Sequence, residues 1–384
     1  MNELITNSPY LLFAGAGASA PLGMKPTGPF MDILPQLLER SITNRIGVNA
    51  TDVSQGFNVL FEHIRNYYEV ETTDSELLLD YLDHMILTCD NLHLLPDLFK
   101  VLSETTGVAE YHQKWRDMFT RLRNDIQSVI VEHYSDVDGS EALELYKPLL
   151  DVLGSSQKVI PIFTTNYDWA FESLADSALD LVTLTDGFHA TQRGLLWNRT
   201  NFDNFTSDYN KINLVLFKLH GSTNWYRDDA NSDVISKIGM AATEIVSSRA
   251  SLIYPTQVKA DSTVIDPFKT AYEYMRESLS RAHLCVIIGF SFRDPAINES
   301  FRQALIENFS LKVLIVEPTV EFGDGQRPQL ERIIGELLPP NTKWEEKIRF
   351  VKENFGPDGS AAREIRSTVS DLYNWTSHQP VAVI

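Results

Sequence analysis

Three polar side chains of this sequence stand directly after apolar runs, where the chain must turn. Asn166 and Asp168 close the stretch IFTTNYD, and His220 precedes a glycine in FKLHGS. An amide both donates and accepts hydrogen bonds, and the ordinary pKa of an imidazole lies near neutrality. These residue types suit a site that binds a hydroxyl group or a water and removes a proton. Each also has a structural interpretation, Asp168 as a helix cap and His220 as a hydrogen-bonded core residue.

The stretch LLFAGAGASA, residues 11–20, predicts a close approach of the backbone to a ligand. An apolar run ends there in small residues that read G-x-G-x-x-A, one form of the dinucleotide-binding fingerprint. These residues are Gly15, Ala16, Gly17, Ala18, Ser19 and Ala20. A P-loop is excluded, because Ala-Ser-Ala-Pro follows Gly17 where that motif requires other residues and a lysine. A plain tight turn of small residues remains the alternative.

The segment after this turn disfavours a hydride-transferring dehydrogenase. Such an enzyme needs a second strand that ends in an acidic residue about 20 positions later. The chain instead continues through LGMKPTGPFMDILPQLLERS, residues 22–41, which has three prolines and a helical pattern. The sequence therefore predicts a nucleotide ligand that does not serve as a hydride carrier.

Recurring apolar runs predict the fold class. Five runs, apolar on every side, suit strands buried on both faces of a parallel sheet. They are YLLFAG (10–15), KVIPIFTTN (158–166), LVLFKLHGS (214–222), HLCVIIGFS (283–291) and KVLIVEP (312–318), with weaker candidates at 178–185 and 251–256. Helical stretches at 168–178 and 295–309 lie between some of them. This βαβ rhythm predicts the α/β class, with a doubly wound, mostly parallel Rossmann-like sheet.

A further polar cluster, Gly289, Ser291 and Asp294, accompanies the end of the run at 283–291. Ligands of open α/β sheets sit outside the carboxyl ends of the strands. We therefore expect this cluster, the glycine turn and the polar residues of IFTTNYD and FKLHGS to face one crevice. Ser291 and Asp294 are otherwise ordinary turn and helix-cap residues. Polar or small residues of a ligand-binding type follow four different strands, and this agreement favours a ligand site.

The segment 46–155 breaks the βαβ rhythm and predicts a helical subdomain inserted after the first strand. One helix is expected from Thr73, with Glu76 as its capping-box partner. A second apolar stripe, expected in a core, comprises Trp115, Met118, Phe119, Leu122, Ile126, Val129 and Ile130. The α/β domain then comprises residues 1–45 and 156–320, and a C-terminal extension that packs on it comprises 321–384.

Composition excludes several classes of protein. The 384-residue chain has 33 basic and 52 acidic side chains, a formal net charge of −19, which argues against direct nucleic-acid binding. Its two cysteines, Cys89 and Cys285, cannot form a four-cysteine zinc site or a disulfide scaffold. No long apolar run predicts a membrane span, and the N-terminus lacks the pattern of a signal peptide. We expect a cytoplasmic protein without membrane contact.

Four motifs resemble, in order and rough spacing, the NAD-binding and catalytic motifs of the sirtuin family. They are GAGAS (15–19), TTNYD (164–168), LHGS (219–222) and GFSFRDP (289–295). The resemblance covers most of residues 9–318. Within that family, the sequence most resembles the sirtuin-like domains of bacterial antiphage systems, notably the stand-alone partners of HerA-type ATPases.

The resemblance implies a role for each candidate residue. The phosphates of NAD+ would contact the turn formed by Gly15, Ala16, Gly17, Ala18 and Ser19. Asn166 and Asp168 would lie beside the nicotinamide ribose and carboxamide, and His220 would be the catalytic base. The adenosine half would be lined by Gly289 and Ser291, with Thr165 and Ser222 as neighbours of the site.

The resemblance also implies an activity, in which NAD+ is a substrate. We expect an NAD+ hydrolase that releases nicotinamide and ADP-ribose, forms a homo-oligomer, docks on a HerA-type ATPase and depletes NAD+ in antiphage defence. No zinc is expected, since two cysteines cannot form the zinc ribbon of the deacylases. The segment GMKPTGPF (23–30) also lacks a Phe-Arg pair after Pro26. Protein deacylation, ADP-ribosyl transfer and a non-catalytic nucleotide sensor remain alternatives.

Overall fold

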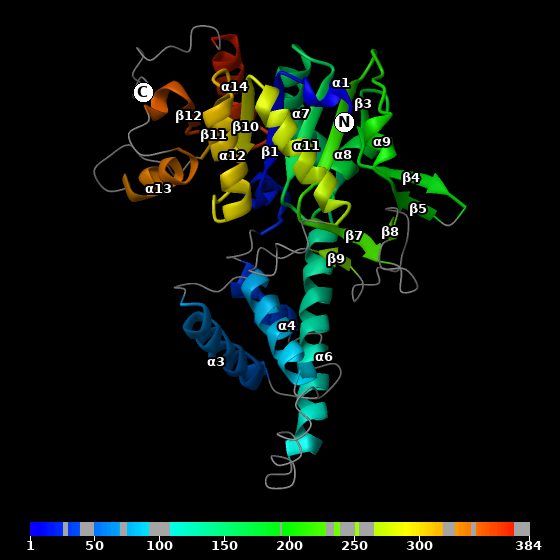
Figure 1. Cartoon of the computed structure of the whole chain (residues 1–384), viewed down its shortest axis with the longest axis vertical. Coiled ribbons are helices and arrows are strands. Elements are labelled where there is room, and N and C mark those ends of the chain that lie inside the picture. Colours follow the sequence, from blue (N-terminus) through cyan, green and yellow to red (C-terminus); the bar gives the residue numbers. More distant parts are fainter. Residues whose placement is uncertain are drawn as a thin grey trace.

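A parallel sheet with helices on both faces forms the upper body of the molecule, and a group of helices projects from it (Figure 1). The computed structural model describes residues 1–25, 30–38, 50–69, 75–91, 108–192, 194–227, 234–238, 250–252, 265–317, 327–338 and 343–371. The expected helix start at Thr73 and most of the segment after Pro26 lie outside these residues.

The main sheet has seven strands in the order β12-β11-β10-β1-β2-β6-β3. Their bounds are β1 Tyr10–Ala14, β2 Val159–Thr164, β3 Val182–Thr185, β6 Ile212–Lys218, β10 Leu284–Ile288, β11 Lys312–Val316 and β12 Ile348–Val351. All neighbouring strands pair in parallel. The predicted α/β class with a mostly parallel sheet is confirmed, and the five apolar runs supply five of the strands.

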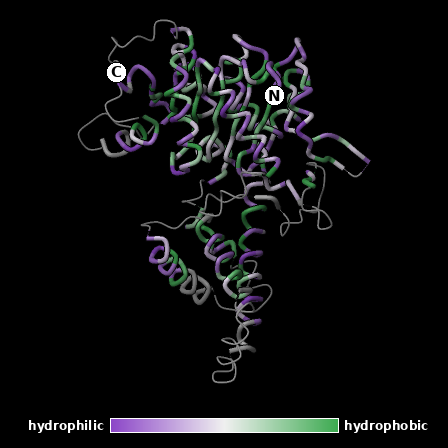
Figure 2. Tube along the Cα trace, in the orientation of Figure 1, coloured by the Kyte–Doolittle hydropathy of each residue, from purple (hydrophilic) through white to green (hydrophobic). Residues whose placement is uncertain are grey.

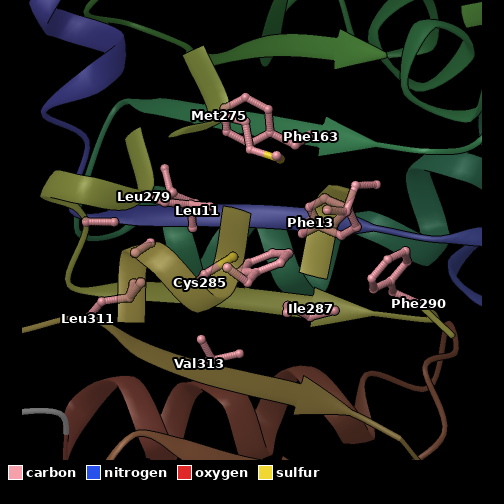
Figure 3. Packing of buried hydrophobic residues seen from close by; sticks show 14 of the residues in the cluster. Leu11, Phe13, Phe163, Met275, Leu279, Cys285, Ile287, Phe290, Leu311 and Val313 are labelled. Carbon is pink, nitrogen blue, oxygen red and sulfur yellow. The ribbon is translucent and has the colours of Figure 1, made fainter. Parts of the chain in front are cut away.

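Alternate residues of these strands enter two separate hydrophobic clusters, one on each face of the sheet. Leu11 and Phe13 face the cluster under α11 (Phe268–Arg281) and α12 (Pro295–Glu307), and Figure 3 shows them against Met275, Cys285 and Ile287. Leu12 lies in the opposite cluster, under α7 (Gly139–Gly154) and α8 (Ala170–Ser177). Burial on both faces explains why these strands read as uninterrupted apolar runs.

A second, smaller sheet is antiparallel and has the order β4-β5-β8-β7-β9. Its strands are β4 Phe188–Thr191, β5 Gly194–Trp197, β7 Gly221–Arg227, β8 Ile235–Lys237 and β9 Ala250–Leu252, with α9 (Thr200–Asp203) between β5 and β6. The weak strand candidate at 251–256 is described only at residues 251 and 252, which belong to β9 of this sheet and not to the parallel one. Only two residues separate the end of β6 from the start of β7, which places the start of the small sheet at the carboxyl edge of the large one.

The projecting helices have a hydrophobic cluster of their own. They are α3 (Ala50–Tyr68), α4 (Ser75–Asn91) and α6 (Val108–Ser135), and residues 30–38, also helical, join the same cluster. Apolar residues are seen along the sheet and along parts of α4 and α6 in Figure 2. The expected core stripe is only partly buried, because Trp115 and Met118 are each 52% exposed.

Helix α7 packs on the sheet and not with the projecting helices, since Leu145, Tyr146 and Leu149 belong to the α/β cluster. The proposed division of the chain at residues 45, 155 and 320 stays a prediction. The C-terminal part contributes β12, α13 (Arg327–Leu337), a 3₁₀ turn at Trp344–Glu346 and α14 (Ser360–Ser370). Short helix α1 (Glu3–Thr6) precedes β1. No helix among the described residues is long and apolar enough to cross a membrane.

Candidate functional site

The glycine turn after β1 packs directly against the turn after β10. The Gly15 amide donates to the Ile288 carbonyl oxygen at 2.8 Å, and the Gly17 amide donates to the Gly289 carbonyl oxygen at 2.9 Å. Two 3₁₀ turns, Ala16–Ala18 and Ala20–Leu22, follow β1, so no α-helix N-terminus begins at this turn. The close approach expected of the glycines is therefore made first of all to the neighbouring strand end.

This contact leaves no room for a side chain at any of the three glycines. A Cβ atom at Gly15 would lie 2.5 Å from the Gly289 carbonyl oxygen, and one at Gly17 would lie 2.8 Å from the Gly289 Cα. Gly289 has a φ of +64°, and its Cβ would lie 2.2 Å from the Ala18 amide nitrogen. Both the left-handed backbone and the packing therefore require glycine at position 289.

Ser19 brings the glycine turn into contact with the polar residues after β2. The Asn166 side-chain amide donates to Ser19 Oγ at 3.0 Å, and the Ser19 side chain lies close enough to Asp168 to lower the pKa of its carboxyl group. All three side chains are buried. Asn166 Oδ1 has no hydrogen-bond partner among the described residues. A buried acceptor without a partner loses about 1–3 kcal/mol unless a ligand or water satisfies it, so Asn166 Oδ1 is a candidate acceptor for a ligand.

The carboxyl group of Asp168 is 4% exposed, and its pKa is raised. Burial is the main cause, because loss of water penalises the charged form; the positive charge of Lys218 and the amide of Ala170 oppose the shift. The Ala170 amide donates to Asp168 Oδ1 at 3.0 Å, but the N-cap of α8 is Trp169 and has no side-chain cap hydrogen bond, so the helix-cap interpretation of Asp168 is wrong. Asp168 therefore precedes the N-cap residue of α8 and has a carboxyl group of raised pKa beside Asn166.

Two lysines, one buried and one half-buried, lie behind these residues. Lys218, 2% exposed, donates to the Asp168 carbonyl oxygen and, at 3.1 Å, to Ser222 Oγ. Its Nζ atom also lies 3.4 Å from Glu172 Oε1. Lys237 of the small sheet reaches the same Glu172 atom at 3.7 Å and is hydrogen-bonded to Asp186. Sequence analysis missed Lys218, although a lysine within the apolar run LVLFKLHG is the signal that identifies it.

His220 lies at the carboxyl end of β6 and contacts the residue that begins α12. Its Nε2 atom is 3.1 Å from Asp294 Oδ2, and both side chains are buried. Asp294 Oδ1 accepts hydrogen bonds from the amides of Ala296 and Ile297. The predicted cap of this helix is confirmed, and the same carboxylate holds the imidazole.

The remaining candidate residues differ in their burial and in their contacts with the residues described above. Ser222 is fully buried and donates to the Tyr167 carbonyl oxygen at 3.2 Å. The Thr165 amide donates to the Ala14 carbonyl oxygen at 3.2 Å, which joins β2 to the glycine turn. Ser291 differs, because its residue is exposed and its carbonyl oxygen accepts from Arg332 of α13. The structure therefore connects all the candidates through neighbouring strand ends, with Ser291 at the margin.

The C-terminal end of α6 reaches the same edge of the sheet. Ser135 and Thr223 approach to 3.1 Å through their hydroxyl groups, and the Tyr134 and Tyr167 rings are 6.4 Å apart between centroids. Tyr134 donates to the Lys25 carbonyl oxygen at 2.6 Å. The projecting helices are thus connected to the segment beyond the glycine turn.

The described residues contain no group of three or more His, Cys, Asp or Glu side chains that could hold a metal ion. Cys89 and Cys285 are both buried, and neither forms a disulfide bond. Burial raises the pKa of the Cys285 thiol, so this thiol is a core residue and not a nucleophile.

Residues 161–332 match the family model described as SIR2-like domain, a range that contains three of the four motifs. The chain is also similar to the structure of a Sir2 homologue in complex with NAD, with 10% identity, coverage of 96% of this chain and 93% of that chain, and a TM-score of 0.40. A second similar structure is described as the structural basis for sirtuin substrate affinity. It has 12% identity, coverage of 94% of this chain and 93% of that chain, and a TM-score of 0.35. A comparison with curated proteins finds no match.

Replacing Gly289 by alanine should destabilise the fold through the contact between the two turns. The left-handed backbone alone costs a non-glycine residue about 1–2 kcal/mol, and the Cβ would overlap the Ala18 amide. We expect urea unfolding to give a loss of about 2 kcal/mol or more. Gly335→Ala is the matched control, because a Cβ there meets no atom within 4 Å and alanine favours the helix. Equal stability of the two variants would contradict the packing described.

Replacing Asp168 by asparagine should change how stability depends on pH. An unfolded Asp ionises near its ordinary pKa of about 3.9, whereas the folded pKa is raised. The contribution of Asp168 to stability is therefore present at low pH and is lost as the pH rises. Between pH 4 and pH 8, we therefore expect the free energy of unfolding of Asp168→Asn to rise relative to that of the unmodified protein. Urea titration at each pH measures this difference.

Asp138 provides a control of opposite sign. It caps α7, and hydrogen bonds from the amides of Glu141 and Ser140 lower its pKa. Its contribution to stability is therefore present at neutral pH and is lost as the pH falls. Asp138→Asn should lose stability relative to the unmodified protein as the pH rises. A constant difference between Asp168→Asn and the unmodified protein at every pH would contradict a raised pKa of Asp168.

Proposed function

We propose that this chain is an NAD+ hydrolase that cleaves the bond between nicotinamide and ribose. The observation that carries the proposal is Asn166, whose amide nitrogen is fixed by Ser19 while its buried oxygen has no partner among the described residues. A ribose hydroxyl or a water fits this acceptor, since each can donate to it. The SIR2-like match over residues 161–332 supports NAD+ as the ligand.

The chemistry requires little activation of the leaving group. The pyridinium ring of NAD+ leaves as neutral nicotinamide, and the transition state carries positive charge on the ribose. A water adds to the same ribose carbon and gives up a proton. In this scheme Asn166 orients the hydroxyl or the water, and His220 accepts the proton. The products are nicotinamide, ADP-ribose and one proton.

The other candidate residues position the substrate. The glycine turn lets the pyrophosphate approach the backbone, and Gly289 lines the adenosine half with Ser291 at its margin. Asp168 lies beside the nicotinamide carboxamide, and Thr165 and Ser222 hold the strand ends. NAD+ is thus a substrate of this site, and none of these residues is asked to bind zinc.

Asn166→Ala and His220→Ala should each lower nicotinamide release by about 10²–10⁴-fold, the usual range for positioned acid–base groups. The assay is incubation of purified protein with NAD+ and chromatography of the products. His283→Ala is the control. This histidine is exposed and lies just before β10, at the opposite end of that strand from the site. Full activity of both site variants would overturn the assignment. Acylated ADP-ribose or modified protein as the product would indicate transferase chemistry, and NAD+ binding without turnover would indicate a sensor.

We extend the proposal to the setting that the four motifs imply, a homo-oligomer that acts with a HerA-type ATPase and depletes NAD+ in antiphage defence. Co-expression with such an ATPase should yield one complex by size-exclusion chromatography, and phage infection of cells that carry both proteins should lower their NAD+. A chain that elutes as a monomer and separately from the ATPase would contradict this part of the proposal and leave the hydrolase assignment standing.

A further inference from the structure

Asp294 contacts two different parts of the molecule with its two carboxylate oxygens. Oδ1 accepts from the amides of Ala296 at 3.0 Å and Ile297 at 3.2 Å, which caps α12. Oδ2 lies 3.1 Å from His220 Nε2. The two side chains are each 4% exposed, so this is a buried contact between residues 74 positions apart in the sequence.

We propose that Asp294 is the positioning residue of the catalytic histidine, a role that rests on the proposed NAD+ hydrolysis. A carboxylate beside Nε2 holds the proton on that nitrogen. The lone pair of the neutral ring is then on Nδ1, which becomes the nitrogen that accepts the proton. The same carboxylate stabilises the imidazolium that forms when the proton arrives.

Helix capping alone does not require an aspartate at this position. Asparagine and serine cap helices about as well, and neither carries a charge that must be buried. Burial of an ion is expensive unless the ion is paired and hydrogen-bonded. Asp294 meets that condition, because the capping amides bond one of its oxygens and the imidazole contacts the other. The contact with His220 is therefore the feature that distinguishes aspartate from the neutral caps.

The turn that carries Asp294 is held rigidly. Phe292, a buried non-glycine residue, has a φ of +55°, a conformation that persists only where the surroundings impose it. Asn298 donates to the Phe292 carbonyl oxygen at 2.9 Å and to Glu336 at 3.1 Å. The turn is thus anchored to α12 and α13, which fixes Asp294 relative to His220 before any ligand binds.

The test compares Asp294→Asn with Asp138→Asn. Asparagine keeps the cap at both helices, but at position 294 its side-chain amide donates to Nε2 and moves the ring proton to Nδ1. We expect Asp294→Asn to lower kcat for nicotinamide release at least about 100-fold while KM for NAD+, affinity for ADP-ribose and the melting temperature change little. Asp138 caps α7 and lies on no strand of the site, so Asp138→Asn should keep full kcat.

A second measurement does not depend on activity. In protein labelled with ¹⁵N-histidine, at pH 8, the ring nitrogens of His220 should report a proton on Nε2 in the unmodified chain and on Nδ1 in Asp294→Asn. The His220 signals are identified by their loss in His220→Asn. An unchanged tautomer and an unchanged kcat in Asp294→Asn would each overturn the proposal. If the unmodified protein released no nicotinamide, the proposed function would fail, and the tautomer would still decide whether Asp294 positions His220.

Discussion

The contact between the turn after β1 and the turn after β10 is the constraint on which the site depends. Gly17 and Gly289 lie so close that neither tolerates a Cβ, and paired amides and carbonyls join the two turns. On one side of the contact, the chain places Ser19 beside Asn166 and Asp168. On the other side it delivers Asp294 to His220. One backbone approach thus sets the positions of both polar groups.

The parallel sheet stabilises the fold enough to hold such a contact, because it buries apolar side chains on both faces. Strands such as β1 and β10 have every residue buried, and each large apolar side chain contributes about 1.5–3 kcal/mol on burial. The polar residues at the carboxyl edge of the sheet destabilise the fold unless they are paired, since buried amides, hydroxyls and charges need partners. Most of them find partners within the chain. The oxygen of Asn166 is one of ten buried side-chain atoms among the described residues that do not, and it lies where the ligand is proposed to bind.

The strands could be predicted from sequence because two-sided burial leaves a plain record, the uninterrupted apolar run. The small sheet could not, since its strands β4 and β5 are short and only partly buried and so carry neither a run nor a clear alternation. Candidate residues at strand ends followed from the geometry of parallel sheets. The pairing of His220 with Asp294 joins residues that no local pattern relates. Trp115 and Met118 have helical spacing like their buried neighbours, and spacing alone does not say where a packed helix ends and an exposed one begins.

The charges behind the site give a reason for the state of Asp168. Two lysines, Lys218 and Lys237, meet the carboxyl groups of Glu172 and Asp186 within ion-pair distance, so these four charges cancel. A charged Asp168 would add a negative charge to this cluster, and the loss of water on burial, with a smaller contribution from Glu172, raises its pKa although Lys218 and the Ala170 amide lower it. A neutral carboxyl group can donate a hydrogen bond. A raised pKa thus shifts Asp168 toward the form that can donate, beside the unsatisfied acceptor of Asn166.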